Sequence, residues 1–153
     1  MTLQSHQTNK RKPWDSYFLD IAYMVATRST CNRKKVGAVI VDSENKHIVS
    51  TGYNGSLPKA EHCVDAGCHM VDNHCTRTVH AETNAINQAA KMGVKLHGKT
   101  IYCTTKPCWN CFKNIIQAGI TSIYYKEDYQ DGSSVLYKKY LKQFPNITLR
   151  SIT

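Results

Sequence analysis

Three side chains in this sequence have the types and spacing of ligands for one zinc ion. His80 begins a His-Ala-Glu triplet, and Cys108 and Cys111 form a Cys-x-x-Cys pair directly after Pro107. One imidazole and two thiolates leave the fourth position of a tetrahedral zinc ion for water, as in catalytic sites. A closed structural site needs a fourth protein ligand, and none lies next to either motif. The pattern therefore predicts a catalytic zinc centre.

Glu82, two residues after the histidine, can move protons beside a zinc-bound water without binding the metal. On its own, a glutamate at a helix start is most simply an exposed carboxylate, but the adjacent His80 favours general acid–base catalysis. Cys108 and Cys111 share a face of a helix. The positive end of that helix would lower their pKa and favour the thiolates that zinc requires.

The elements that must position these residues are indicated by hydrophobic periodicity. Residues 14–29 space apolar side chains three and four apart, which predicts a helix. Strands over 36–41 and 47–53 should pair as a hairpin around a polar turn at 42–46. The later elements are a helix over 80–92 ended by Gly93, a strand over 99–103, a helix over 109–118 ended by Gly119, a strand over 120–125, a helix over 135–144 and a strand over 147–150. This order predicts an α/β domain with a mixed sheet of about five strands and helices on both faces.

Residues 54–79 show no clear period, and a segment of that length needs an anchor. We assign Cys103 to the core of a strand. Four thiols then remain, the number that a closed tetrahedral zinc site takes. These are Cys31, Cys63, Cys68 and Cys75. His74 could replace one thiol, and His62 and His69 compete as ligands. The alternative is that the cysteines are buried, reduced thiols.

Composition indicates one domain and an intracellular setting. The 153 residues are enough for one core, and no apolar run approaches a membrane span. We expect a flexible basic arm over 1–12, without a secretory signal, followed by a single catalytic domain over 13–153. Seven cysteines without an export signal indicate reduced thiols in the cytoplasm of a cell or infected host. The net charge of +9 favours an anionic partner, although solvation of basic side chains explains such an excess more simply than nucleic-acid binding.

Longer motifs around these residues resemble one family. They are VGAVIV at 36–41, TGYNGS at 51–56, RTVHAETNAI at 77–86 and IQAGI at 116–120. From about Trp14 to Ile147, the chain is similar to deoxycytidylate (dCMP) deaminases of the zinc-dependent cytidine deaminase-like superfamily. The resemblance implies a three-layer α/β/α sandwich. It also implies hydrolytic deamination of dCMP to dUMP and ammonia, which supplies the thymidylate precursor.

Two other functions remain open at this point. A deaminase of tRNA adenosine or polynucleotide cytosine would suit the basic charge and Arg77. The long 54–79 segment and its preceding Gly-Tyr-Asn-Gly turn favour a mononucleotide instead. A catalytically silent zinc-binding scaffold is the third possibility, and the intact Glu82 argues against it.

The resemblance also implies the substrate contacts. Asn54 should hydrogen-bond the sugar hydroxyls, and Ala81 and Tyr129 should lie against the nucleotide. Without the resemblance, Asn54 belongs to an ordinary turn and Tyr129 is a half-exposed aromatic. From charge alone, the basic run at 33–35 is best placed for the 5′-phosphate, or else is a solvated loop. The sequence does not select one of its residues, and Arg33 and Lys35 are our named candidates.

Regulation and assembly are implied only by the resemblance. Family members are typically hexamers, activated by dCTP and inhibited by dTTP, with magnesium on the triphosphate. The matching allosteric positions are Gly52, Tyr53, Gly55 and Lys91. Lys91 stands where a relative carries arginine, so the charge is kept but the bidentate fork is lost. Lys91 could instead simply stabilise the end of its helix. Some members also carry a second zinc, with cysteines at positions matching Cys31 and Cys63.

Overall fold

The computed structural model describes residues 10–153, so most of the predicted basic arm lies outside the described residues. Residues 10–12 are exposed and have no regular secondary structure. In the described part of the chain, no helix combines the length and apolar character needed to cross a membrane.

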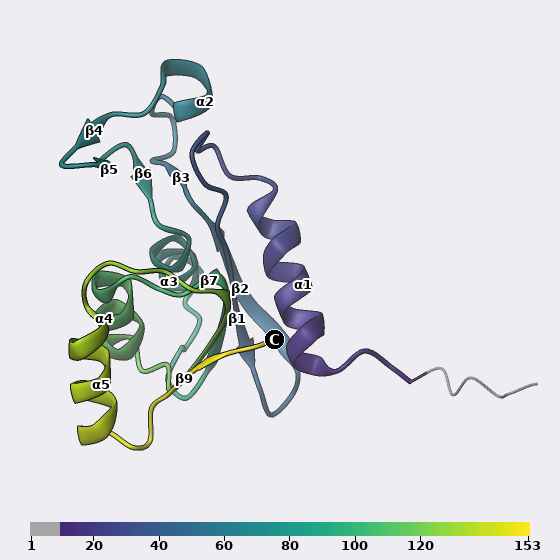
Figure 1. The fold of residues 1–153 in the computed structure, drawn as a ribbon. Coiled ribbons are helices and arrows are strands. Elements are labelled where there is room, and N and C mark those ends of the chain that lie inside the picture. The colour runs from purple at the N-terminus through teal and green to yellow at the C-terminus, as the bar shows by residue number, and fades with distance from the viewer. Residues whose placement is uncertain (1–9) are drawn as a thin grey trace, which may run out of the picture.

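A five-stranded sheet forms the centre of the molecule (Figure 1). Its strands are β1 (Gly37–Asp42), β2 (His47–Tyr53), β7 (Thr100–Thr105), β8 (Ser122–Glu127) and β9 (Thr148–Ser151), in the order β2-β1-β7-β8-β9. β1 is antiparallel to β2 and β7, whereas β8 is parallel to β7 and β9. The predicted hairpin and mixed sheet are therefore confirmed.

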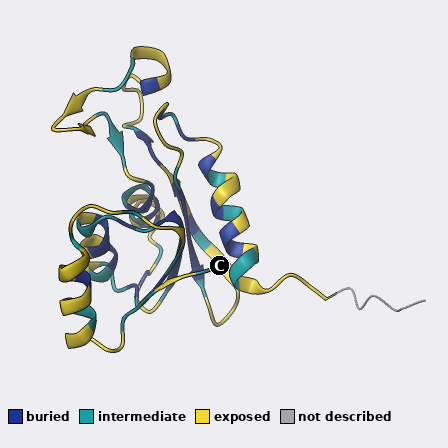
Figure 2. Cartoon of the chain, in the orientation of Figure 1, coloured by how far each residue is buried: buried dark blue, intermediate teal, exposed yellow. Residues whose placement is uncertain are grey.

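Helices cover both faces of this sheet. α1 (Trp14–Ala26) lies on one face, and α3 (Ala81–Met92), α4 (Trp109–Gln117) and α5 (Ser134–Gln143) lie on the other (Figure 1). Side chains alternate along β1, so that Val39 packs with Phe18 of α1 while Ile40 packs with Phe112 of α4. The buried residues follow the sheet and the inner sides of the helices (Figure 2). This arrangement confirms the three-layer α/β/α sandwich.

The helix ends mostly agree with the glycine signals. α3 ends at Gly93, which adopts a left-handed conformation with φ of 68°, and α4 ends just before Gly119. The prediction for α1 was three residues too long, because the helix ends at Ala26. The Thr27 hydroxyl donates to the Met24 carbonyl at 2.6 Å, which supplies the backbone with a local alternative to helix.

Residues 54–79 contain only short pieces of regular structure and extend away from the sheet (Figure 1). β3 (Gly55–Ser56) pairs with β6 (Thr78–Val79), and β4 (Met70–Val71) pairs with β5 (His74–Cys75). A single helical turn, α2 (Cys63–Ala66), precedes them. The absence of a clear period in the sequence matches this irregular structure.

Candidate active site

The predicted zinc ligands lie where two helices begin. His80 is the N-cap residue of α3, and Cys108 is the N-cap residue of α4. Cys111 follows in the first turn of α4 and is buried. β7 ends at Thr105, so the same strand end that leads into Pro107 delivers both cysteines. Two positive helix ends therefore meet at one point, as the motif spacing indicated.

The distances between the three donor atoms fit one zinc ion. His80 Nδ1 lies 3.6 Å from Cys108 Sγ and 3.3 Å from Cys111 Sγ. Zinc–nitrogen and zinc–sulfur bonds at a tetrahedral angle place such atoms about 3.5 Å apart. All three donors lie within 4.8 Å of one another, and the cluster holds three protein ligands. The site therefore suits zinc with a fourth position left for a small molecule.

Electrostatics prepares the thiols for a metal. Hydrogen bonds from Cys111 and His80 lower the pKa of Cys108 to about 4. The pKa of Cys111 is raised because its thiol donates to Cys108 and is buried. One thiolate is therefore present before binding, and the second forms when a cation offsets its charge.

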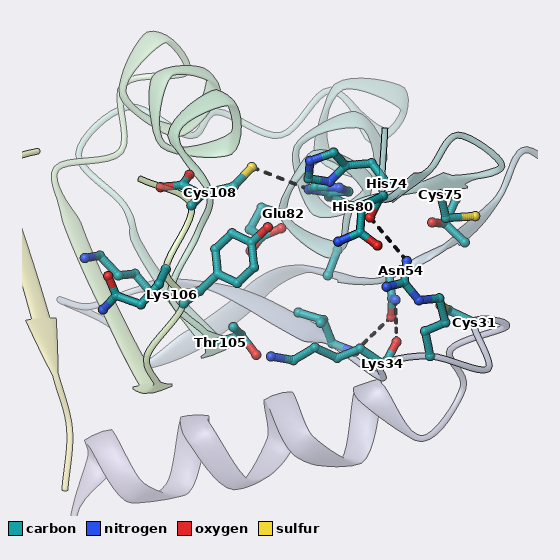
Figure 3. Close-up of a pocket in the computed structure, with 18 residues that line it drawn as sticks. Cys31, Lys34, Asn54, His74, Cys75, His80, Glu82, Thr105, Lys106 and Cys108 are labelled. Carbon is teal, nitrogen blue, oxygen red and sulfur yellow. Dashed lines mark hydrogen bonds between the residues drawn. The ribbon is translucent and has the colours of Figure 1, made fainter. Parts of the chain in front are cut away.

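Glu82 points into the same space as His80 and Cys108 (Figure 3). Its side chain is only 4% exposed. Burial raises the pKa of this carboxyl above its ordinary value. A carboxyl whose proton affinity is increased in this way can both accept and return a proton, which is the requirement for a general acid and base.

A cavity of about 690 Å³ opens in front of these residues, a size typical of small-molecule sites. Of the predicted substrate residues, Asn54, Ala81, Tyr129 and Arg33 line the cavity. Lys35 is not among the lining residues, whereas its neighbour Lys34 is. The predicted basic run therefore reaches the cavity, but the sequence could not tell that Lys34, and not Lys35, lines it. Binding of the 5′-phosphate by this run stays a prediction.

Asn54 fixes the chain at the edge of the cavity. Its amide nitrogen donates to the Lys34 carbonyl at 2.7 Å, and its amide oxygen accepts from the Val36 N–H at 2.8 Å. Only one amide hydrogen and one lone pair then remain for another partner. A contact from Asn54 to a sugar hydroxyl stays a prediction.

Arg33 is engaged with the β4–β5 hairpin. Its Nη1 lies 3.2 Å from Met70 Sδ and 3.5 Å from the Asn73 carbonyl oxygen. These contacts hold the hairpin beside the cavity, which Asn73 and His74 also line. Because its guanidinium is used in this way, Arg33 is less available for a phosphate than its position in the sequence suggested.

The irregular segment brings three thiols together. The sulfur atoms of Cys63, Cys68 and Cys75 lie within 4.8 Å of one another. Hydrogen bonds from backbone N–H groups lower the pKa of Cys75 to about 6 despite its burial, whereas burial raises that of Cys63 to about 12. Cys31 is buried but does not meet the same distance limit, so three of the four predicted thiols form the cluster. His74 is also outside this set.

The remaining predicted residues are placed as follows. Cys103 is fully buried in β7, as expected for a core residue. Gly52, Tyr53, Gly55 and Lys91 do not line the cavity. At Gly52 a Cβ atom would lie 2.2 Å from the Ala81 carbonyl oxygen, so this glycine allows β2 to approach the start of α3.

Thr105 and Asp131 are among the cavity residues that the sequence analysis missed. The buried Thr105 hydroxyl has no hydrogen-bond partner among the described residues. Asp131 accepts a hydrogen bond from the Trp109 N–H at 3.0 Å, beside a zinc ligand. The only feature of the sequence that could have placed Thr105 at the site is its position just before the Lys-Pro-Cys segment. Asp131 belongs to an Asp-Gly-Ser stretch that looks like any other turn.

Fold and site together define a zinc-dependent deaminase domain. A family model described as the cytidine and deoxycytidylate deaminase zinc-binding region matches residues 12–127. The chain belongs to this family.

Individual relatives agree with this assignment. The chain is 50% identical over 121 residues to ComE operon protein 2 of Bacillus subtilis, with 79% of this chain and 63% of that protein covered. It is 36% identical over 126 residues to a deoxycytidylate deaminase of Saccharomyces cerevisiae, with 78% and 39% covered. The chain thus spans only part of the length of these two relatives.

A solved structure of dCMP deaminase from the cyanophage S-TIM5, in complex with dCMP and dUMP, matches with a TM-score of 0.77 at 28% identity. The match covers 94% of this chain and 100% of that chain.

Proposed function

We propose that this protein catalyses zinc-dependent hydrolytic deamination of dCMP to dUMP and ammonia, supplying the thymidylate precursor. The observation that carries the proposal is the convergence of three zinc donors and one buried carboxyl on a single cavity. The relatives named deoxycytidylate deaminase support this substrate class, as does the phage enzyme bound to dCMP and dUMP.

The residues of the site suit the steps of this reaction. When bound, zinc lowers the pKa of water and so supplies hydroxide near neutral pH. Glu82 accepts the proton that the water loses and delivers a proton to the pyrimidine ring nitrogen. C4 of cytosine then carries both a hydroxyl and the amine. Glu82 takes the proton of this hydroxyl and passes it to the amine, so that the C4–N bond breaks, ammonia leaves and the C4 carbonyl of uracil forms. Such proton transfers accelerate reactions by roughly a hundred- to ten-thousand-fold.

Lys34 is the cation that we assign to the 5′-phosphate. Its side chain extends through the cavity from the Asn54 side toward Thr105 (Figure 3). Arg33, by contrast, contacts the β4–β5 hairpin. Asn54, Ala81 and Tyr129 would contact the nucleoside part, because they line the same cavity.

The test is ammonia release from dCMP, deoxycytidine, dCTP and a tRNA anticodon stem. We expect dCMP to be the preferred substrate. Lys34→Ala should raise the KM for dCMP and leave turnover of deoxycytidine unchanged, because only the nucleotide carries the phosphate. Turnover confined to the RNA would replace this proposal with the polynucleotide alternative. Arg77, which suited that alternative in the sequence, pairs through Nη1 with Glu61 at 3.1 Å.

A second, structural zinc at the thiol cluster is part of the proposal. Three thiols within bonding reach of one ion support it, and a fourth ligand would complete the tetrahedron. Cys31 and His74 are the candidates, since both line the adjacent cavity. Mass spectrometry under native conditions should find about two zinc ions per chain, the number that one open and one closed site would hold. Cys63→Ser should remove one of them, and unchanged metal content in that variant would contradict the second site.

Regulation, assembly and location are proposed on the family resemblance. We expect a cytoplasmic hexamer that magnesium–dCTP activates and dTTP inhibits through Gly52, Tyr53, Gly55 and Lys91. Exposed apolar side chains nearby could be covered in such an assembly, since Tyr53 is 37% exposed and Met92 is 69% exposed. Sedimentation with and without the two triphosphates, together with their effect on dCMP turnover, tests both parts. A monomer that neither effector influences would contradict them.

A further inference from the structure

The helix that carries two zinc ligands lacks a cap of its own. An N-cap side chain normally accepts a hydrogen bond from an N–H group of the first turn. The N-cap residue of α4 is Cys108, which makes no such bond. Its sulfur lies 3.6 Å from His80 Nδ1 and belongs to the zinc cluster. The first turn of α4 also contains no acidic residue, so a carboxylate that accepts from its N–H groups has to come from another part of the chain.

Asp131 supplies that acceptor from a different part of the chain. It lies between β8 and α5. One carboxylate oxygen accepts from the Trp109 N–H at 3.0 Å, and the other accepts from the Ser133 N–H at 2.9 Å. A carboxylate at this point also faces the positive end of α4, where negative charge is favourable.

The loop that contains Asp131 also carries a residue of the cavity wall. Tyr129 lines the cavity two positions before Asp131. The Asp128 carboxylate accepts from the Tyr129 N–H at 2.9 Å, and Lys106 Nζ lies 3.9 Å from the same carboxylate. The loop is therefore attached to the strand-to-helix connection on both sides of Tyr129.

We propose that Asp131 is a positioning residue for the reaction, because one carboxylate holds both the Cys108–Cys111 turn and the Tyr129 loop. It acts through the Trp109 N–H and not by binding the metal. The expected fall in kcat rests on the proposed function, because it requires that the protein deaminates dCMP. The expected faster release of zinc does not depend on that activity.

Asp131→Asn is the decisive variant. The amide keeps the size of the side chain but has one acceptor oxygen, so one of the two N–H groups loses its partner. We expect zinc to leave the catalytic site about tenfold faster, in the range seen when groups that orient metal ligands are removed. The kcat for dCMP should fall by a similar factor. A chromogenic chelator follows zinc release, and the phase that is absent in His80→Ala identifies the catalytic site.

Asp42→Asn is the matched control. Asp42 also accepts two backbone hydrogen bonds in a turn, from Glu44 and Asn45, both at 3.1 Å. Asp42 is the last residue of β1, whereas Val36, just before the first residue of β1, lines the cavity. The control therefore changes the end of the strand that is far from the site. This control should melt earlier than the wild type yet release zinc at the wild-type rate.

An Asp131→Asn protein that melts earlier but retains zinc and kcat like the control would overturn the proposal, since Asp131 would then be only a loop cap. Faster zinc release in a protein that never deaminates dCMP would support the positioning role. That result would count against the proposed function alone.

Discussion

A single methyl group at position 52 tests whether the spacing between β2 and α3 controls the chemistry. In Gly52→Ala, the new Cβ would lie 2.2 Å from the Ala81 carbonyl oxygen and 2.4 Å from the Ala85 nitrogen. Ordinary contacts begin near 3.4 Å. Both neighbours are backbone atoms, so no side chain can rotate away. We expect the start of α3 to move away from β2 by about 1 Å, the difference between these distances.

Two magnitudes follow from that displacement. Overpacking of a tight core costs about 1–3 kcal/mol, and a clash with helix backbone belongs near the upper limit. For a protein of this size, a loss of about 3 kcal/mol lowers the Tm by about 6–12 °C. Because His80 and Glu82 lie at the displaced helix start, kcat for dCMP should also fall about a hundredfold.

Gly37→Ala is the control for this prediction. Its Cβ would lie 2.0 Å from the Ala22 carbonyl oxygen of α1, on the opposite face of the sheet from α3. Calorimetry should record a similar loss of Tm for both variants, while only Gly52→Ala should lose about a hundredfold in kcat. Equal losses of kcat in the two variants would refute the reasoning, because activity would then follow stability alone.

Three further outcomes are expected. Glu82→Gln should keep its zinc, measured by mass spectrometry, and lose roughly a hundred- to ten-thousand-fold in kcat, because the amide cannot carry the proton. Chelation of zinc should abolish activity and lower the Tm in calorimetry, and added zinc should restore both. Hydrogen bonds from Lys99 and from the Asn45 N–H lower the pKa of Asp42 to about 2 from 3.8, so its stabilisation is present above about pH 4 and is lost as the pH falls toward 2. Acid unfolding of Asp42→Asn should accordingly depend less on pH in that window.

Much of the fold was predictable because local signals and packing agree. β1 and β7 are rich in residues that favour strands and are buried along nearly their whole length, and Gly93 and Gly119 stop their helices. Where a competing local bond exists, the prediction was wrong by a few residues, as at Thr27 after α1. The proximity of the three candidate zinc ligands was predictable for a related reason. Their spacing within each motif is set by helix geometry, and the same geometry holds in the structure.

The cavity wall was less predictable, because it depends on how distant loops meet. Lys34 and Lys35 have the same side chain, so the sequence does not distinguish them. In the structure the Asn54 amide nitrogen donates to the Lys34 carbonyl and the Asn54 amide oxygen accepts from the Val36 N–H, which fixes the backbone of this segment. That constraint sets which side chain faces the cavity. No periodicity in residues 33–36 encodes it.

Asp131 illustrates the same limit at the metal. Cys108 is both the N-cap of α4 and a candidate zinc ligand, and it makes no side-chain cap bond, so the Trp109 N–H takes its acceptor from outside the helix. The sequence contains this need at Cys108, although the residue that meets it lies beyond an intervening helix and strand. A cysteine pair at a helix start therefore predicts an acceptor for the first-turn N–H groups elsewhere in the chain. Only the folded chain identifies the residue that provides it. The start of α3, where His80 is also a cap residue without a side-chain cap bond, is held in a different way. There the Asn84 side chain donates to the Tyr53 and Val79 carbonyls, which ties the first turn of α3 to the strands beside it.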